Sequence, residues 1–223
     1  MKKIGILFSG GVALIIFSAL PAEAQDEKPK SNFSVGADVY SNYIWRGTKF
    51  GKGPSVQPAV KFITGGLTIG AWGSFDASGY SETDPYISYS LPFGLSLGVT
   101  DYFYPFLGGS FFSDSASVYE LNLGYTLKGL SLSANYIINK APVPVSSGSD
   151  LYFQAGYAFR HFNITVGAGN GWHTSDTKFN VCHIAIGTGK TIEITDKFSV
   201  PVTGQLILNP ERKQVFVVVG FSL

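Results

Sequence analysis

The sequence has little charge, a single cysteine and no long apolar run after its first residues, and each shortage excludes a class of protein. Charged residues make up 14% of the 223 residues, well below the ~25% of an ordinary globular domain. The formal net charge of +1 argues against nucleic-acid binding, for which a strongly basic face is expected. One cysteine excludes an internal disulfide framework and a cysteine-based zinc site.

The chain is nevertheless apolar and rich in aromatic residues. Hydrophobic residues account for 45% and aromatic residues for 15% of the sequence, and the mean hydropathy is +0.18. This composition excludes a disordered tail. Helical membrane spans would appear as runs of about 20 apolar residues, and none follows the N-terminal segment. The apolar residues must therefore be distributed in another way.

The first 24 residues have the layout of a secretory signal peptide. A basic start is followed by an apolar run over residues 4–20 and by Ala22 and Ala24, which form an Ala-x-Ala cleavage pattern. An uncleaved membrane anchor, the alternative, would not need that pattern. We expect cleavage before Gln25, a short flexible lead over residues 25–31, and a mature chain that is exported through the inner membrane.

From residue 32 to residue 223 the pattern has the period of two that is typical of strands. Apolar residues occupy every second position in segments such as 67–72, 118–127 and 151–159. Near copies of Gly-Leu-Ser-Leu recur along the chain, and short turns alternate with longer connections. We predict an all-β fold, a transmembrane antiparallel up-and-down barrel of about 12 strands, with 10–14 as the range. The expected strands are 33–45, 56–64, 67–75, 85–92, 95–104, 118–128, 130–139, 151–160, 162–170, 179–188, 197–208 and 214–223.

The second face of these strands separates a membrane barrel from a secreted β-sandwich or jelly roll. A sandwich would carry charged residues on its outer face, whereas this face is mostly glycine, serine, asparagine and threonine. Aromatic residues also gather near the expected strand ends. One group, with Tyr43, Trp45 and Trp172, lies near the long connections, and another, with Phe33 and Phe162, lies near the short turns. Two aromatic girdles are typical of a transmembrane barrel.

The last predicted strand has the form of an assembly signal. Apolar residues alternate up to the end of the sequence, at Val215, Val217, Val219, Phe221 and Leu223. Outer-membrane barrels resemble this ending, because their assembly machinery reads an alternating, aromatic-rich last strand. Leu223 stands where the usual residue is Phe or Trp.

The opening of the predicted barrel resembles a known family. Residues 41–47 read Ser-Asn-Tyr-Ile-Trp-Arg-Gly, with Tyr43, Trp45, Arg46 and Gly47, and Gln57 follows in a Pro-Ser-Val-Gln-Pro segment. This block resembles the start of the TorF-type porins, over about residues 33–104. The resemblance implies an outer-membrane barrel with pore activity, and it carries over no catalytic or ligand-binding residue.

Phasing the predicted strands places a set of polar side chains inside the barrel. Arg46 is expected at the top of the first strand, and Asp76 and Arg160 at strand ends. Charges in a lumen tune ion selectivity, but Asp38, Lys61 and Glu120 can equally pair as a plug that stabilises a narrow barrel. The candidate pore-lining residues are Asp38, Arg46, Lys61, Trp72, Asp76, Glu120, Gln154, Arg160 and Gln205.

The phase is unclear at two places. Asp101 falls on the lipid-facing side of its strand, where a carboxylate in mid-bilayer is costly, so we expect it near the outer interface or at a bulge. Around residues 181–187 our preferred phase turns Cys182, Ile184 and Ile186 toward lipid and His183 inward.

Nothing in the sequence supports catalysis or a cofactor. His161, His173 and His183 stand beside no recognisable nucleophile motif, and Gly-x-Ser-x-Gly is absent. Asp150 and Asp176 lack the ligand spacing of a cation site. We expect no catalytic residue, metal or cofactor, and an outer-membrane enzyme is the least supported alternative.

The sequence thus predicts a barrel in the outer membrane of a Gram-negative bacterium, which passes small solutes or ions by passive diffusion. Its expected partners are outer-membrane lipids and lipopolysaccharide, the barrel-assembly machinery and the diffusing solutes, and not nucleic acid. The alternative from another class is a closed structural or adhesive barrel that acts through its outer loops. Lumen width separates the two, and inward Tyr40, Trp72, Tyr152 and Phe216 are able to close the lumen.

Overall fold

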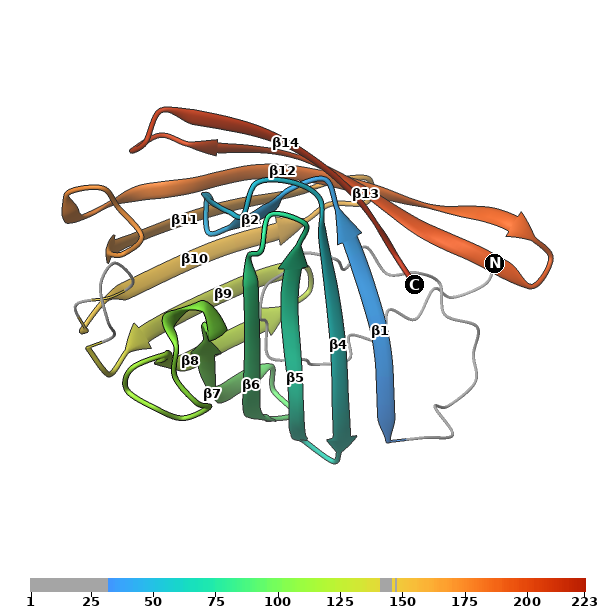
Figure 1. Ribbon diagram of the computed structural model, residues 1–223. Helices are drawn as coiled ribbons and strands as arrows, with labels where there is room; N and C mark the ends of the chain where they lie inside the picture. The colour runs from blue at the N-terminus through green and yellow to red at the C-terminus, as the bar shows by residue number, and fades with distance from the viewer. Residues whose placement is uncertain (1–31, 141–145, 147) are drawn as a thin grey trace.

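The computed structural model describes residues 32–140, 146 and 148–223, so the predicted signal peptide and lead lie outside the described residues. Twelve strands form one closed antiparallel barrel (Figure 1), as the period of two predicted. Strands that follow one another in the wall are hydrogen-bonded neighbours, and the last closes on the first. They are β1 (Phe33–Tyr40), β4 (Ser55–Thr64), β5 (Leu67–Asp76), β6 (Ser81–Ser90), β7 (Leu95–Phe103), β8 (Ser117–Leu127), β9 (Leu130–Ile137), β10 (Leu151–Ala158), β11 (Asn163–Gly171), β12 (Thr177–Thr195), β13 (Phe198–Asn209) and β14 (Gln214–Ser222).

One predicted strand, 33–45, is wrong in its second half. β1 ends at Tyr40, which pairs directly with Ser55 at the start of β4. The chain between them leaves the wall and forms a separate two-stranded sheet, β2 (Tyr43–Trp45) with β3 (Thr48–Phe50). We call residues 41–54 the inner hairpin. Its side chains contact inward-facing residues of the wall, as the ring contact of Trp45 with Tyr102 shows.

A two-residue turn, Arg46-Gly47, makes the inner hairpin sharp. Trp45 pairs with Thr48, and both turn residues have positive φ, 49° at Arg46 and 82° at Gly47. This backbone is the type I′ turn whose twist matches that of two antiparallel strands. The Arg-Gly pair therefore reverses the chain directly after the predicted strand 33–45 ends.

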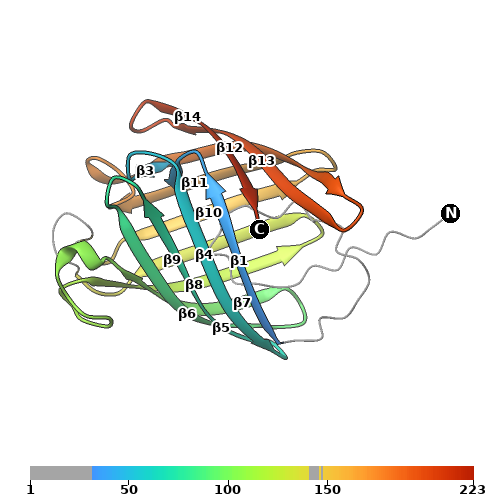
Figure 2. The same ribbon diagram turned by 45° about the vertical axis from the view of Figure 1, so that its right-hand side comes forward.

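The connections differ at the two ends of the barrel, as the sequence predicted. At one end are the short turns at 65–66, 91–94, 128–129, 159–162 and 196–197. The other end carries the inner hairpin and long loops over 104–116 and 138–150, the first of which contains a short 3-10 helix, Pro105–Leu107. Its connections 77–80 and 210–213 are only as long as 91–94 and 159–162, so the predicted long connection before residue 85 is shorter than expected. β12 and β13 extend past their neighbours at the short-turn end (Figure 2), because β11 pairs with β12 only as far as Gly187.

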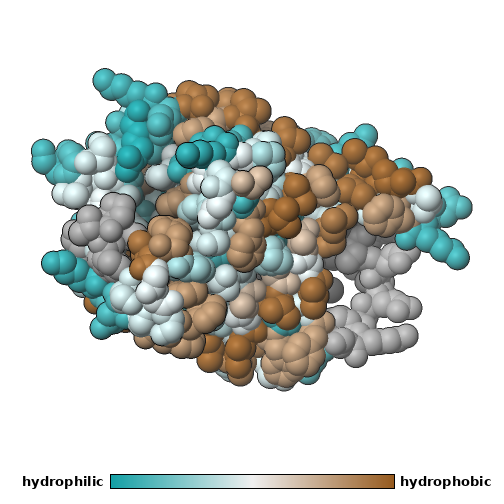
Figure 3. All heavy atoms as spheres, in the orientation of Figure 1, coloured by the Kyte–Doolittle hydropathy of each residue, from teal (hydrophilic) through white to brown (hydrophobic). Residues whose placement is uncertain are grey.

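The outer face of the wall is an apolar belt. Val215, Val217 and Val219 of β14 are 62%, 66% and 52% exposed, and Phe221 and Leu223 lie on the same face. In Figure 3 brown apolar atoms cover much of the wall, and teal hydrophilic atoms gather at its left and right ends. Such a belt on a closed wall is the outside of a membrane barrel, because closure leaves no unpaired sheet edge in lipid.

Aromatic side chains on this outer face support only one of the two predicted girdles fully. At the short-turn end Phe33 packs on Phe62 at 4.9 Å between ring centroids, and Phe159 stacks on Phe162 at 4.6 Å. At the other end, by contrast, Tyr43, Trp45 and Trp172 turn into the barrel. There Tyr43 contacts Trp72, and both Trp45 and Trp172 contact Tyr102.

No helix among the described residues is long and apolar enough to cross a membrane.

The two positions of unclear phase are resolved. Asp101 keeps the outward phase close to the long-loop end of β7, where it is buried and accepts a hydrogen bond from the Ser117 hydroxyl at 3.1 Å. His183 faces inward and Ile186 outward, as preferred. Cys182 is fully buried rather than lipid-facing, because the register of β11 and β12 shifts beside it.

Candidate functional site

The inner hairpin is fixed inside the barrel by a buried ion pair. Arg46 at its tip donates two hydrogen bonds to the carboxylate of Glu120 on β8, at 2.7 and 2.9 Å. The two side chains are 11% and 1% exposed. Tyr102 and Asn122 also donate to Glu120, at 2.9 and 2.6 Å. The bidentate pair is the strong geometry for guanidinium and carboxylate, and the extra donors satisfy the buried carboxylate further.

Aromatic rings enclose the guanidinium group. Its central carbon lies 4.3 Å from the ring centroids of both Trp45 and Tyr152, which adds cation–π attraction from two sides. Trp45 in turn contacts Tyr102 at 5.4 Å and Trp172 at 5.1 Å. The tip of the inner hairpin is therefore packed on residues from β7, β10 and the β11–β12 loop.

The other half of the inner hairpin rests on β5 and β6. The Tyr43 ring lies 5.4 Å from the ring of Trp72 and 6.1 Å from that of Tyr80. Tyr80 donates to Glu82 at 2.6 Å. The sheet of β2 and β3 thus spans the lumen, with Arg46 on one side and Tyr43 on the other.

Gly47 lets the tip approach β12. Asn209 on β13 donates to the Gly47 carbonyl at 3.0 Å, and a Cβ at Gly47 would overlap the carbonyl oxygen of Cys182. We expect Gly47→Ala to lower the free energy of unfolding by at least about 2 kcal/mol, because strain at positive φ adds to the overlap. Gly53→Ala is the matched control, since nothing lies within 4 Å of its Cβ. Urea unfolding in lipid vesicles measures both, and equal stability of the two variants would refute this contact.

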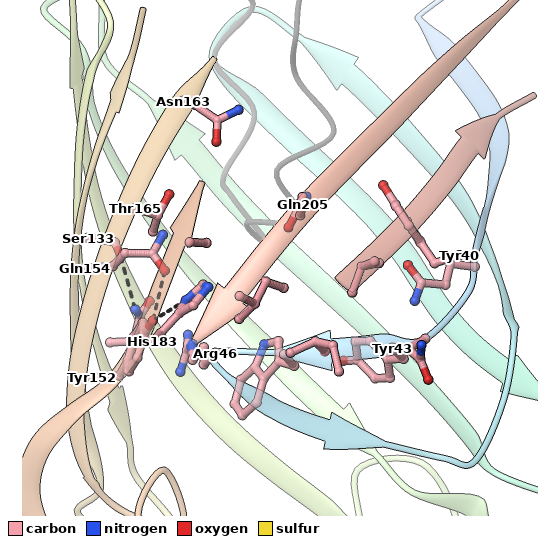
Figure 4. Close-up of a pocket in the computed structure, with 18 of the residues that line it drawn as sticks. Tyr40, Tyr43, Arg46, Ser133, Tyr152, Gln154, Asn163, Thr165, His183 and Gln205 are labelled. Atoms are coloured by element: carbon pink, nitrogen blue, oxygen red, sulfur yellow. Dashed lines mark hydrogen bonds between the residues drawn. The ribbon is translucent and has the colours of Figure 1, made fainter. Parts of the chain in front are cut away.

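A polar cavity lies beside the inner hairpin in the lumen (Figure 4). The volume open to the centres of water-sized molecules is about 70 Å³. Amide and hydroxyl side chains from most of the wall strands reach it. They include Gln57, Thr100, Asn122, Ser133, Asn135, Gln154, Asn163, Thr165 and Gln205.

Two long loops are tied together beside the tip of the inner hairpin. Asp150, in the β9–β10 loop, accepts hydrogen bonds from the Ser146 hydroxyl and from the Trp172 backbone N–H. Burial raises the pKa of Asp150, and these two hydrogen bonds oppose the shift. Burial, and then the charge of Arg46, lower the pKa of His173 well below its usual value. His173 is therefore neutral at pH 7, and it accepts from Trp172 Nε1 at 2.9 Å.

The structure brings some of the predicted pore-lining residues together and separates others. Gln154 and Gln205 line the cavity. Asp38 and Lys61 follow the inward phase of β1 and β4, and Trp72 is buried under Tyr43. Glu120 pairs with Arg46, not with Lys61 or Asp38.

Two predicted positions need correction, those of Arg46 and Arg160. Arg46 does not project into the mouth from the end of a wall strand, because the inner hairpin carries it into the barrel. Asp76 ends β5 as predicted, and it accepts hydrogen bonds from the backbone of Lys52 and Ser78, at 2.7 and 2.8 Å. Arg160 lies exposed in the β10–β11 turn, away from the cavity.

The residues that receive the inner hairpin were not among the predicted site residues, apart from Glu120 and Trp72. Three of them, Tyr102, Asn122 and Asn135, lie on the same inward face of the wall as Glu120. The alternation of the strands therefore indicates that they face inward. Tyr152 was expected to face inward, but its contact with the Arg46 guanidinium was not.

Two histidines of the described chain make short contacts with aromatic residues. His183 Nδ1 lies 3.2 Å from the Tyr152 hydroxyl, and His173 is bonded to Trp172. Across the described ranges, no group of three His, Cys, Asp or Glu is arranged to hold a metal ion.

The apolar outer face and the polar interior define a closed barrel of the outer-membrane type. The chain belongs to the family described as "Bacterial protein of unknown function (Gcw_chp)", whose model matches residues 24–199. The resemblance to TorF-type porins stays a prediction. No curated protein matches the sequence.

Solved structures with a similar barrel are distant. A mutant porin from Rh. blastica is 15% identical with a TM-score of 0.41; the match covers 76% of this chain and 55% of the porin, so the chain spans about half of the porin's length. Outer membrane phospholipase A from Escherichia coli is 12% identical with a TM-score of 0.43, over 90% of this chain and 93% of the enzyme. At these values the likeness carries no argument about activity.

Proposed function

We propose that this protein is a channel of the bacterial outer membrane, through which small polar solutes or ions diffuse passively, and that the inner hairpin narrows it. The supporting observation is the polar cavity enclosed by a closed wall whose outer face is apolar. Toward the short-turn end many inward positions hold small residues, which take little space in the lumen. They are Ser96, Gly98, Gly124, Ser131, Gly156 and Gly187.

The proposal includes export by the signal peptide, insertion by the assembly machinery through the β14 pattern, and contact with lipids and lipopolysaccharide along the belt. Its first test is location and fold. The protein is expected to fractionate with outer membranes, and unboiled and boiled samples are expected to migrate differently on a denaturing gel. Recovery in the soluble periplasmic fraction would instead support a secreted β-sandwich.

Charges on the inward face give a second test, by ion preference in planar bilayers. Lys61 faces the lumen on β4, so Lys61→Glu is expected to shift the permeability ratio toward cations by roughly twofold, because lumen charges set selectivity. Lys190→Glu is the matched control, since Lys190 is exposed on the part of β12 that extends beyond β11. An unchanged ratio in Lys61→Glu would remove Lys61 from the conducting path.

A closed structural or adhesive barrel is the second candidate, and one observation favours it. The inner hairpin is packed across the lumen by Arg46, Trp45 and Tyr43. If the hairpin never moves, the barrel acts only through its outer loops. Absence of any conductance step above a detergent control would favour this candidate over the channel.

A further inference from the structure

The cavity beside the inner hairpin is lined without net charge. Among the described residues that line it, Arg46 is the only one with a formal charge at neutral pH, and Glu120 neutralises it at 2.7 Å. An ion in this cavity would meet no free counter-charge. Taking an ion out of water without a partner is costly, so the lining favours an uncharged solute.

One side of the cavity is a continuous polar arc on β7 to β11. Asn122 and Asn135 are direct cross-strand neighbours, and so are Ser133 and Gln154. Asn122 Nδ2 donates to Asn135 at 3.1 Å and Thr100 donates to Asn122 at 2.9 Å. The arc is thus pre-ordered by its own hydrogen bonds.

Some polar atoms of the lining keep unused hydrogen-bonding capacity. Gln154 Oε1 accepts from the Tyr152 hydroxyl at 2.9 Å, and the Gln154 side chain lines the cavity. Gln57 on β4 also lines the cavity, and its Oε1 atom is buried and has no partner among the described residues. A buried acceptor without a partner is costly, so a bound hydroxyl group that reached Gln57 Oε1 would stabilise it.

The other side of the cavity is apolar. Tyr40, Ala185, Ile207 and Val218 form one buried cluster on β1, β12, β13 and β14, and all four line the cavity. In Figure 4, Tyr40 lies across the space from Ser133, Gln154 and Thr165. The cavity therefore has a hydrogen-bonding side and an opposing aliphatic and aromatic side.

We propose that this cavity binds a small uncharged polyhydroxylated solute, with its hydroxyl groups on the polar arc and its C–H face against Tyr40, Ile207 and Val218. Polyols and sugars carry both kinds of surface on one small molecule, and neither a free ion nor a hydrocarbon does. This assignment rests on the proposed channel function and names the class of solute that the channel takes.

Saturation-transfer NMR on the refolded mature protein, in a detergent without a sugar headgroup, tests the binding directly. The probes are methyl β-glucoside and xylitol, with gluconate as the charged comparison. We expect transfer to methyl β-glucoside and xylitol, strongest at their C–H protons, and at least fivefold weaker transfer to gluconate. No transfer to either neutral probe, or equal transfer to gluconate, would overturn the assignment.

Two variants locate the site. Gln154→Leu removes hydrogen-bonding groups from the polar arc, and is expected to weaken transfer about fivefold; Ser131→Ala, inward on β9 but outside the cavity, is expected to leave it unchanged. If the leucine form does not show the folded gel band, Gln154→Glu takes its place. Glutamate keeps the shape of the side chain but lacks the amide N–H groups, so the same weaker transfer is expected. Equal signals in all forms would contradict this location. Binding without conductance would defeat the channel proposal alone, and conductance without binding would defeat this assignment alone.

Discussion

Arg46→Ala is expected to lower the free energy of unfolding by about 3–5 kcal/mol, because it leaves the Glu120 carboxylate buried without its counter-charge. The side chains of the pair are nearly inaccessible, and the alanine form also loses the contacts of the guanidinium with Trp45 and Tyr152. Urea unfolding of the protein in lipid vesicles measures the change.

An exposed pair in the same protein provides the control. Lys178 and Asp176 lie 3.6 Å apart with side chains 83% and 50% exposed, so Lys178→Ala is expected to change stability by less than about 0.5 kcal/mol. The charge-reversed double variant Arg46→Glu with Glu120→Arg is expected to recover part of the loss that each single reversal causes. If Arg46→Ala and Lys178→Ala are equally mild, the buried pair does not hold the inner hairpin.

The second large effect concerns the inner hairpin as a whole. Tyr40 and Ser55 are cross-strand partners, so a four-residue Gly-Ser turn in place of residues 41–54 is able to join β1 to β4. All twelve wall strands remain, because β2 and β3 form a sheet of their own. The shortened protein is expected to fold and to admit larger solutes than the wild type.

Liposome swelling in a trisaccharide measures this effect. We expect swelling at least several times faster with the shortened protein than with the wild type. A variant of unchanged length, in which residues 108–110 of the β7–β8 loop are replaced by Gly-Ser-Gly, controls for loop changes that leave the inner hairpin in place. A shortened barrel that shows the folded gel band but the wild-type swelling rate would show that the hairpin does not limit passage.

Much of the wall follows from the sequence. A strand with one face toward lipid and one toward a polar lumen must alternate, so each wall strand was visible in the period of two, and the short turns fixed their ends within a few residues. β14 matches its predicted range of 214–223 to within one residue. β12 is longer than predicted, because hydrogen bonds to β13 continue it to Thr195 after β11 has ended.

The inner hairpin did not follow from the same pattern, for a physical reason. Tyr43 and Trp45 alternate with smaller or polar neighbours whether their strand lies in the wall or inside the barrel, and both settings bury aromatic rings. The positive φ of Arg46 and Gly47 marks the turn of the inner hairpin and distinguishes it from a wall strand. A sequence gives only a weak indication of a positive φ at an arginine. The partner of Arg46 is 74 residues away, and the register that brings it near is set by the intervening strands.

The most direct test of the central claim, that the inner hairpin narrows a polar channel, is single-channel recording in planar bilayers. The wild-type mature protein and the form with residues 41–54 replaced by Gly-Ser are compared at the same salt concentration. Discrete steps are expected for both, with a conductance at least several times larger for the shortened form. Equal conductance in the two, or no step from either folded protein, would contradict it.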